Sequence, residues 1–147
     1  MANTYTIDAS VFLNAFNPNE VGYQESHQFL ALLQAQGMPI IVPTLVLPEV
    51  AAAISRGHDD EGLARQFATA LSRLPHLILV SLDRALANQS TDIAAQYRLR
   101  GSDAVYAAVA LRFGTTLVTL DREQKERVAP IILTGNPTDA LAELEQE

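Results

Sequence analysis

Short apolar runs alternate along the chain with longer segments in which apolar residues recur at helical spacing. The short runs are typical of buried strands, which we expect at 4–8, 38–43, 76–80, 115–120 and 131–133. The longer segments predict helices at 9–16, 23–35, 44–57, 60–74, 82–100, 102–113 and 122–128. This alternation predicts an α/β fold, a three-layer α/β/α sandwich around a central parallel sheet of four or five short strands.

Four acidic residues stand where expected strands end and expected helices begin. Asp8 and Asp121 follow apolar strands, while Glu49 and Asp103 fall in the opening turns of helices. In a βα unit these two places share one edge of the sheet, and parallel sheets bind ligands at that edge. We therefore expect the four carboxylates to lie close together.

Each of these acids also has a purely structural explanation. Asp8 and Asp121 can cap the helices that follow them, with Gln124 completing a capping box after Asp121. Glu49 and Asp103 can interact with the positive ends of their own helices. Taken singly, each explanation is sufficient.

Taken together, the structural explanations are weaker. Glu49 is the only charged residue between Met38 and Ser55, and no lysine or arginine is near Asp8 or Glu49 in the sequence. Buried carboxylates that share one edge repel each other unless a positive charge offsets them. A divalent cation would do so. Oxygen ligands, with no cysteine and no histidines at ligand spacing, favour Mg²⁺ or Mn²⁺ over zinc.

Composition limits the remaining possibilities. The 147 residues, 48% of them hydrophobic, predict one domain over 1–138 followed by an acidic tail over 139–147. The sequence has no cysteine, no basic and apolar leader and no long uncharged apolar stretch. We therefore expect a soluble, cytoplasmic protein that does not associate with a membrane.

The net charge of −7 argues against a nucleic-acid partner, but the charge is unevenly distributed. The segment 139–147 carries four acids and no base, whereas six of the ten basic residues fall between Arg98 and Arg127. These basic residues are either solvated helix faces or a basic rim beside the acidic edge. In the second case Arg98, Arg100 and Arg122 are candidates for contacts with RNA phosphates.

Four segments carry a family resemblance in their order and spacing: "IDASVFLNAF" (7–16), "VLPEV" (46–50), "GSDAVYAAVA" (101–110) and "LVTLDRE" (117–123). Together they resemble the PIN-domain nucleases, and specifically the VapC-like toxins of prokaryotic toxin–antitoxin pairs. The resemblance covers nearly the whole chain.

The resemblance implies a PIN-like parallel sheet between helices, with Mg²⁺ or Mn²⁺ held by four acids. Those positions match Asp8, Glu49, Asp103 and Asp121, which would be both the metal ligands and the catalytic residues. Ser10 and Thr119 match hydroxyl positions that support the ligands. Glu123 is the nearest match to a further acid that some members place after the last aspartate.

Together with the resemblance, these observations favour a metal-dependent endoribonuclease that hydrolyses RNA phosphodiester bonds. The resemblance implies that it is the toxin of a toxin–antitoxin pair. Asp8 and Asp103 are the first candidates for ligands, and the products would be 5′-phosphate and 3′-hydroxyl ends. One alternative is a non-catalytic PIN-like module that acts through a protein partner, and another is a housekeeping RNA-processing nuclease. Phosphotransfer enzymes fit less well, because "DAS" (8–10) lacks the second aspartate of a D-x-D phosphatase.

Two kinds of protein partner are expected. The apolar segments "VFLNAF" (11–16) and "FLALL" (29–33) are candidates for an exposed surface in a homodimer, and the alternative is that they face the core of a monomer. The resemblance also implies an antitoxin, which would block the site by delivering a cation, typically an arginine, to the carboxylates.

Overall fold

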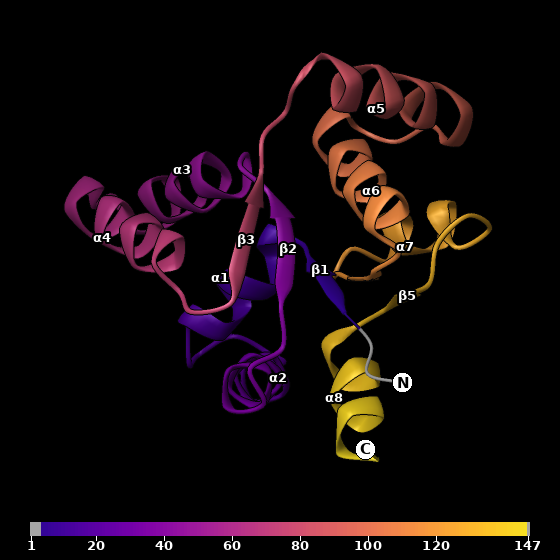
Figure 1. The fold of residues 1–147 in the computed structure, drawn as a ribbon. Helices are drawn as coiled ribbons and strands as arrows, with labels where there is room; N and C mark the ends of the chain where they lie inside the picture. Colours follow the sequence, from indigo (N-terminus) through magenta and orange to yellow (C-terminus); the bar gives the residue numbers. More distant parts are fainter. Residues whose placement is uncertain (1–3, 147) are drawn as a thin grey trace.

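The computed structural model describes residues 4–146, and these form a five-stranded parallel sheet and eight helices (Figure 1). The strands lie in the order β3-β2-β1-β4-β5, and every neighbouring pair is parallel. The strands are β1 (Tyr5–Ile7), β2 (Ile40–Pro43), β3 (Leu77–Val80), β4 (Thr116–Val118) and β5 (Thr134–Gly135). The α/β/α prediction is confirmed.

The helices cover both faces of this sheet. They are α1 (Ala9–Phe16), α2 (Tyr23–Ala35), α3 (Val46–His58), α4 (Glu61–Ser72), α5 (Arg84–Tyr97), α6 (Gly101–Phe113), α7 (Arg122–Val128) and α8 (Pro137–Glu145). Figure 1 shows α3 and α4 on one side of the sheet and α5 and α6 on the other. None of the helices in the described part of the chain is long and apolar enough to cross a membrane.

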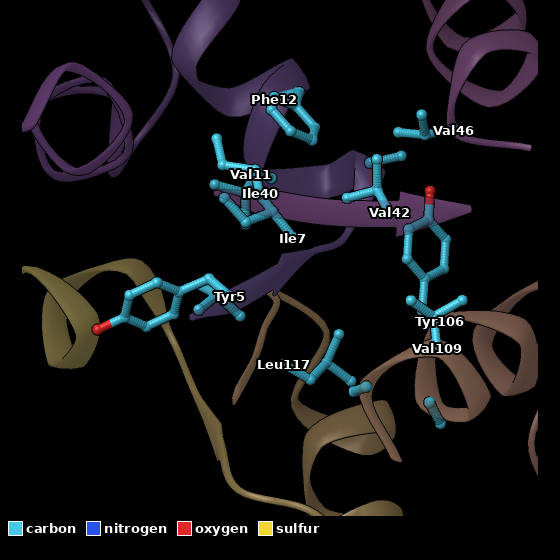
Figure 2. Close-up of a cluster of buried hydrophobic side chains, with 14 of the residues drawn as sticks. Tyr5, Ile7, Val11, Phe12, Ile40, Val42, Val46, Tyr106, Val109 and Leu117 are labelled. Atoms are coloured by element: carbon cyan, nitrogen blue, oxygen red, sulfur yellow. The ribbon is translucent and has the colours of Figure 1, made fainter. Parts of the chain in front are cut away.

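The core lies between the central strands and helices α1 and α6. Figure 2 shows Ile7 of β1 beside Val11 of α1, whereas the ring of Tyr5, also in β1, extends toward α8. Helix α6 is buried over the whole run from Ala104 to Ala110, which explains why that run contains no charge. Burying each large apolar side chain contributes about 1.5–3 kcal/mol, so this packing fixes the helix ends firmly.

The register of the central strands brings the expected site residues together. Ile7 pairs with Val118, so Asp8 and Thr119 leave the sheet side by side at the carboxyl edge. The backbone N–H of Asp8 donates to the Val118 carbonyl at 3.0 Å, which extends the pairing of β1 and β4 by one step. The pairing of β1 and β4 therefore continues up to the sheet edge where the sequence predicts the carboxylates.

The last strand differs from the prediction. Residues 131–133 were the apolar candidate, but the strand is Thr134–Gly135. The N–H groups of Ile131 and Ile132 donate to the Val128 carbonyl and complete the end of α7. These N–H groups are therefore not available to the sheet, and Leu133 is 73% exposed.

The acidic segment 139–147 and the apolar segments 11–16 and 29–33 also differ from expectation. The described part of the acidic segment 139–147 belongs mostly to α8, which packs on α2 and buries Ala140 and Leu144. In the apolar segments 11–16 and 29–33, Val11, Phe12, Phe29 and Leu33 are buried, whereas Leu13, Leu30 and Leu32 are partly buried against the core. The exposed apolar surface is therefore smaller than expected, and a homodimer through it stays a prediction.

Candidate active site

Asp8 is the most buried of the four predicted acids, with 8% of its surface exposed. It follows β1 and caps α1, and its Oδ2 accepts a hydrogen bond from the Ser10 backbone N–H at 3.0 Å. Burial raises the pKa of the Asp8 carboxyl, hydrogen bonds from Ser10 and Thr119 oppose this rise, and the Asp121 carboxylate adds to it. The predicted capping role is real, but it leaves a buried negative charge that the cap alone does not offset.

Glu49 lies in the first turn of α3 and is held by a residue from a different element. The hydroxyl group of Tyr106 in α6 donates to Glu49 Oε1 at 2.7 Å. Figure 2 shows the Tyr106 ring extending from α6 toward Val42 and Val46. Burial raises the pKa of the Glu49 carboxyl, the Tyr106 hydrogen bond lowers it, and the Asp8 and Asp103 carboxylates raise it.

Asp103 lies in the first turn of α6, and its side chain is 18% exposed. Burial, followed by the carboxylates of Asp8 and Asp121, raises its pKa from 3.8 to about 6. Arg100 opposes this rise only weakly, because its Nε lies 4.0 Å from Asp103 Oδ2 and its side chain is 81% exposed. In the described part of the chain this is the only ion pair made by any of the four predicted acids.

Asp121 follows β4 and caps α7 by accepting the Gln124 backbone N–H at 3.1 Å. The predicted capping box is not formed, because the Asp121 N–H donates at 3.0 Å to the hydroxyl of Thr119 and not to the Gln124 side chain. The neighbouring Leu120 N–H donates to Ser10 Oγ at 3.2 Å. Ser10 and Thr119 thus connect the loops that carry Asp8 and Asp121.

The four acids form one electrostatic unit. Asp103 is affected by both Asp8 and Asp121, and Glu49 is affected by both Asp8 and Asp103. Asp8 and Asp103 are therefore central to the unit, with Glu49 and Asp121 on its flanks. The sequence prediction that these acids share one edge is supported by this coupling.

The carboxylates affect one another's pKa values, but their side chains do not converge on one point. Among residues 4–146, no three acidic or histidine side chains converge as ligands around a single ion. Three of the acids instead hold separate hydrogen bonds, to Ser10, Tyr106 and Gln124, and like charges oppose any closer approach. The four carboxylates still suit a hard divalent cation. They offer several oxygen ligands, some from carboxyl groups whose pKa is raised, and almost no positive side chain competes with the cation for them.

Beside these acids lies a small pocket of about 30 Å³ between the α5–α6 connection and α7. Its lining includes Arg98 and Arg100, two of the predicted phosphate contacts, together with Asp103 and Asp121. The third, Arg122, is not part of this lining and instead faces Glu126 at 3.6 Å with 87% of its side chain exposed.

Residues that sequence reasoning missed also contribute to this region. Arg127 lines the pocket, pairs with Glu123 and donates to the Arg98 carbonyl, which stabilises the left-handed backbone of Arg98 (φ 57°). Tyr106 could have been noticed as the one polar side chain in the run 104–111, one helical turn after Asp103. Arg127 belongs to the basic cluster noted in the sequence, but nothing there distinguished it from the other basic residues of that cluster.

The fold and the site together define a class of protein. It is a parallel α/β/α domain with acidic residues at the carboxyl edge of its sheet. The PIN domain family matches residues 5–129, and the chain belongs to this family. No curated protein matches the chain significantly.

Solved structures share the fold at low sequence identity. PAE2754 from Pyrobaculum aerophilum is 20% identical, with a TM-score of 0.73 over 100% of this chain and 98% of that one. VapC20 from Mycobacterium tuberculosis, described as a sarcin–ricin loop cleaving toxin, is 16% identical, with a TM-score of 0.69 over 84% and 94%. A toxin–antitoxin complex from Klebsiella pneumoniae is 20% identical, with a TM-score of 0.65 over 92% and 98%.

Proposed function

We propose that the protein is a metal-dependent endoribonuclease and the toxin of a toxin–antitoxin pair. The observation that carries the proposal is the coupled set of Asp8, Glu49, Asp103 and Asp121, whose charge no lysine and only one distant arginine offsets in the described structure. Family membership and the description of VapC20 as a toxin that cleaves the sarcin–ricin loop support RNA as the substrate. The proposal places the protein in the cytoplasm, with its RNA.

Asp8 and Asp103 would hold Mg²⁺ or Mn²⁺, and Glu49 and Asp121 would complete the site directly or through water. Such a cation lowers the pKa of a bound water and stabilises charge on a leaving oxygen. The chain's own contribution is to fix the carboxylates: Ser10 holds Asp8, and Tyr106 holds Glu49. In-line attack of water on the phosphorus would break its bond to the 3′ oxygen and leave 5′-phosphate and 3′-hydroxyl ends.

The substrate backbone would lie across the small pocket beside the acids. The lining of this pocket has equal numbers of acidic and basic residues, so a bound cation would make the pocket positive. The acids are Asp103, Asp121 and Glu123, and the bases are Arg98, Arg100 and Arg127. Phosphate binding there would therefore depend on the metal. Arg122 stays a weaker candidate for a phosphate contact at the rim.

The test is cleavage of a panel of RNAs (an rRNA stem–loop, a tRNA and an mRNA) and of DNA with the same sequences. The wild-type protein should cleave RNA in Mg²⁺ or Mn²⁺ but not in EDTA, and Asp8→Asn should be inactive. Asp92→Asn, at an exposed position of α5, is the matched control and should retain activity. Binding of Mn²⁺ without cleavage of any RNA would favour the non-catalytic module instead.

An antitoxin partner distinguishes a toxin from an RNA-processing nuclease that uses the same site. The toxin–antitoxin complex from Klebsiella pneumoniae among the similar structures supports this part of the proposal. A short neighbouring gene for a DNA-binding protein with a flexible tail should accompany the gene of this chain. Co-expression and co-purification of the two products would test the pairing.

A further inference from the structure

Gln124, in the first turn of α7, has a side chain that its surroundings only half satisfy. The residue is 1% exposed, and its Oε1 lies 2.8 Å from Thr119 Oγ1. Its Nε2 is buried without a hydrogen-bond partner among the described residues. A buried N–H group left unpaired costs about 1–3 kcal/mol, so a glutamine retained here calls for an explanation.

Thr119 connects this glutamine to two of the acids. Its hydroxyl accepts the Asp121 N–H at 3.0 Å and donates to Gln124 Oε1. Thr119 also leaves the sheet beside Asp8, because Ile7 pairs with Val118, and its hydroxyl group lowers the pKa of the Asp8 carboxyl. A hydroxyl group has one proton and two acceptor positions, so Thr119 cannot donate to Gln124 and Asp8 at the same time.

A half-turn of the Gln124 amide removes this conflict. The rotation exchanges the oxygen and the nitrogen, so that Nε2 donates to Thr119 Oγ1. Thr119 then accepts from Asp121 and Gln124 and donates to Asp8, which uses its full hydrogen-bonding capacity. The amide oxygen takes the unpartnered place, which buried carbonyls tolerate more often than buried N–H groups.

We propose that Gln124 is a positioning residue that directs the Thr119 proton to Asp8 and so orients the Asp8 carboxylate for a divalent cation. The proposal rests on the metal site of the proposed function and adds a residue that is not itself a metal ligand, although Gln124, 1% exposed, is among the residues that line the small pocket. Gln124 acts through Thr119 alone, which makes the two residues one functional unit. Mutation of a group that orients a metal ligand by hydrogen bonding typically lowers metal affinity by about 10–100-fold.

A double-mutant cycle on Mn²⁺ affinity, measured by electron paramagnetic resonance of the free ion, tests the proposal. Gln124→Met removes the amide at similar volume and should weaken Mn²⁺ binding about tenfold. The same change should have the same effect beside Thr119→Ser, which keeps the hydroxyl. It should have almost no effect beside Thr119→Val, which lacks it.

Gln34→Met is the matched control. Gln34 in α2 also has a buried Nε2 without a partner among the described residues, but it makes no described contact with the site residues. Urea unfolding of every variant should accompany the titrations, and Thr119→Ala replaces Thr119→Val if the latter does not fold. Gln34→Met should change unfolding free energy without changing Mn²⁺ affinity.

Three outcomes would overturn the inference or its basis, and they are distinguishable. If Gln124→Met lowers stability but binds Mn²⁺ like the wild type, Gln124 has only a structural role. If its effect on Mn²⁺ affinity adds fully to that of Thr119→Val, the effect does not pass through Thr119. If the wild-type protein binds no Mn²⁺, the metal site itself fails.

Discussion

Replacing Asp103 with asparagine should stabilise the metal-free protein at neutral and alkaline pH. The pKa of this carboxyl is raised from 3.8 to about 6, mainly by burial and then by the carboxylates of Asp8 and Asp121. Each pH unit between the folded and unfolded pKa values is worth about 1.4 kcal/mol, which gives a ceiling of about 3 kcal/mol. Because Asp103 is partly exposed, solvent screening reduces the expected gain to about 1–2 kcal/mol.

The pH dependence of this effect has a definite sign. A carboxyl whose folded pKa is raised binds its proton more tightly in the folded state, so its contribution to stability is complete below about pH 4. That contribution is lost as the pH rises through about 6. The advantage of Asp103→Asn should therefore be largest at pH 8 and should shrink steadily as the pH is lowered toward 4.

Urea unfolding of metal-free samples at pH 8, 6 and 4 measures this effect, with Asp92→Asn as the control on an exposed acid. Addition of Mn²⁺ should reverse the order at pH 8, because a ligand at 100 times its Kd stabilises the folded wild type by about 2.7 kcal/mol. Equal stability of wild type and Asp103→Asn at pH 8 in EDTA would refute the reasoning. So would a difference that does not change with pH.

Three further predictions follow from the site and its partners. Tyr106→Phe removes the hydroxyl that holds Glu49, and loss of a hydrogen bond to a charged group, worth about 1.5–3 kcal/mol, should weaken Mn²⁺ binding by tenfold or more in calorimetry; unchanged affinity would show that Glu49 needs no support. An antitoxin that delivers an arginine to the carboxylates should lose inhibition as Mg²⁺ is raised, and inhibition that excess Mg²⁺ leaves intact would place its contact elsewhere. As the resemblance to VapC-like toxins implies, the protein should sediment at micromolar concentration as a dimer, and a clean 16.0 kDa species would exclude this.

The sequence was sufficient for the layers of the fold and for the edge that carries the acids. Apolar runs without charge, such as the one in α6, have to be buried, and acids at their ends are then confined to the same edge of a parallel sheet. The coupling of Asp8 and Asp103 follows from that geometry. The ends of strands were harder to predict. The N–H groups of Ile131 and Ile132 donate to the Val128 carbonyl at the end of α7 and are therefore not available to pair in β5.

The supporting hydrogen bonds were beyond prediction from the sequence. Tyr106 and Glu49 are 57 positions apart, and their contact depends on how α6 and α3 pack across the sheet edge. A capping box closed by Gln124 was one structural explanation for Asp121, but the Thr119 hydroxyl lies between the two residues. The acidic composition of 139–147 likewise concealed the apolar positions through which α8 packs, including Leu144.

The most direct test of the account is a crystal structure with Mn²⁺ and an anomalous difference map at the manganese absorption edge. The account predicts one or two peaks among the carboxylates of Asp8, Glu49, Asp103 and Asp121, with these side chains drawn closer together than in the metal-free protein. It also predicts that the peaks vanish in crystals of Asp8→Asn. A map with saturating Mn²⁺ that shows no peak at these four residues, or a peak only elsewhere, would contradict it.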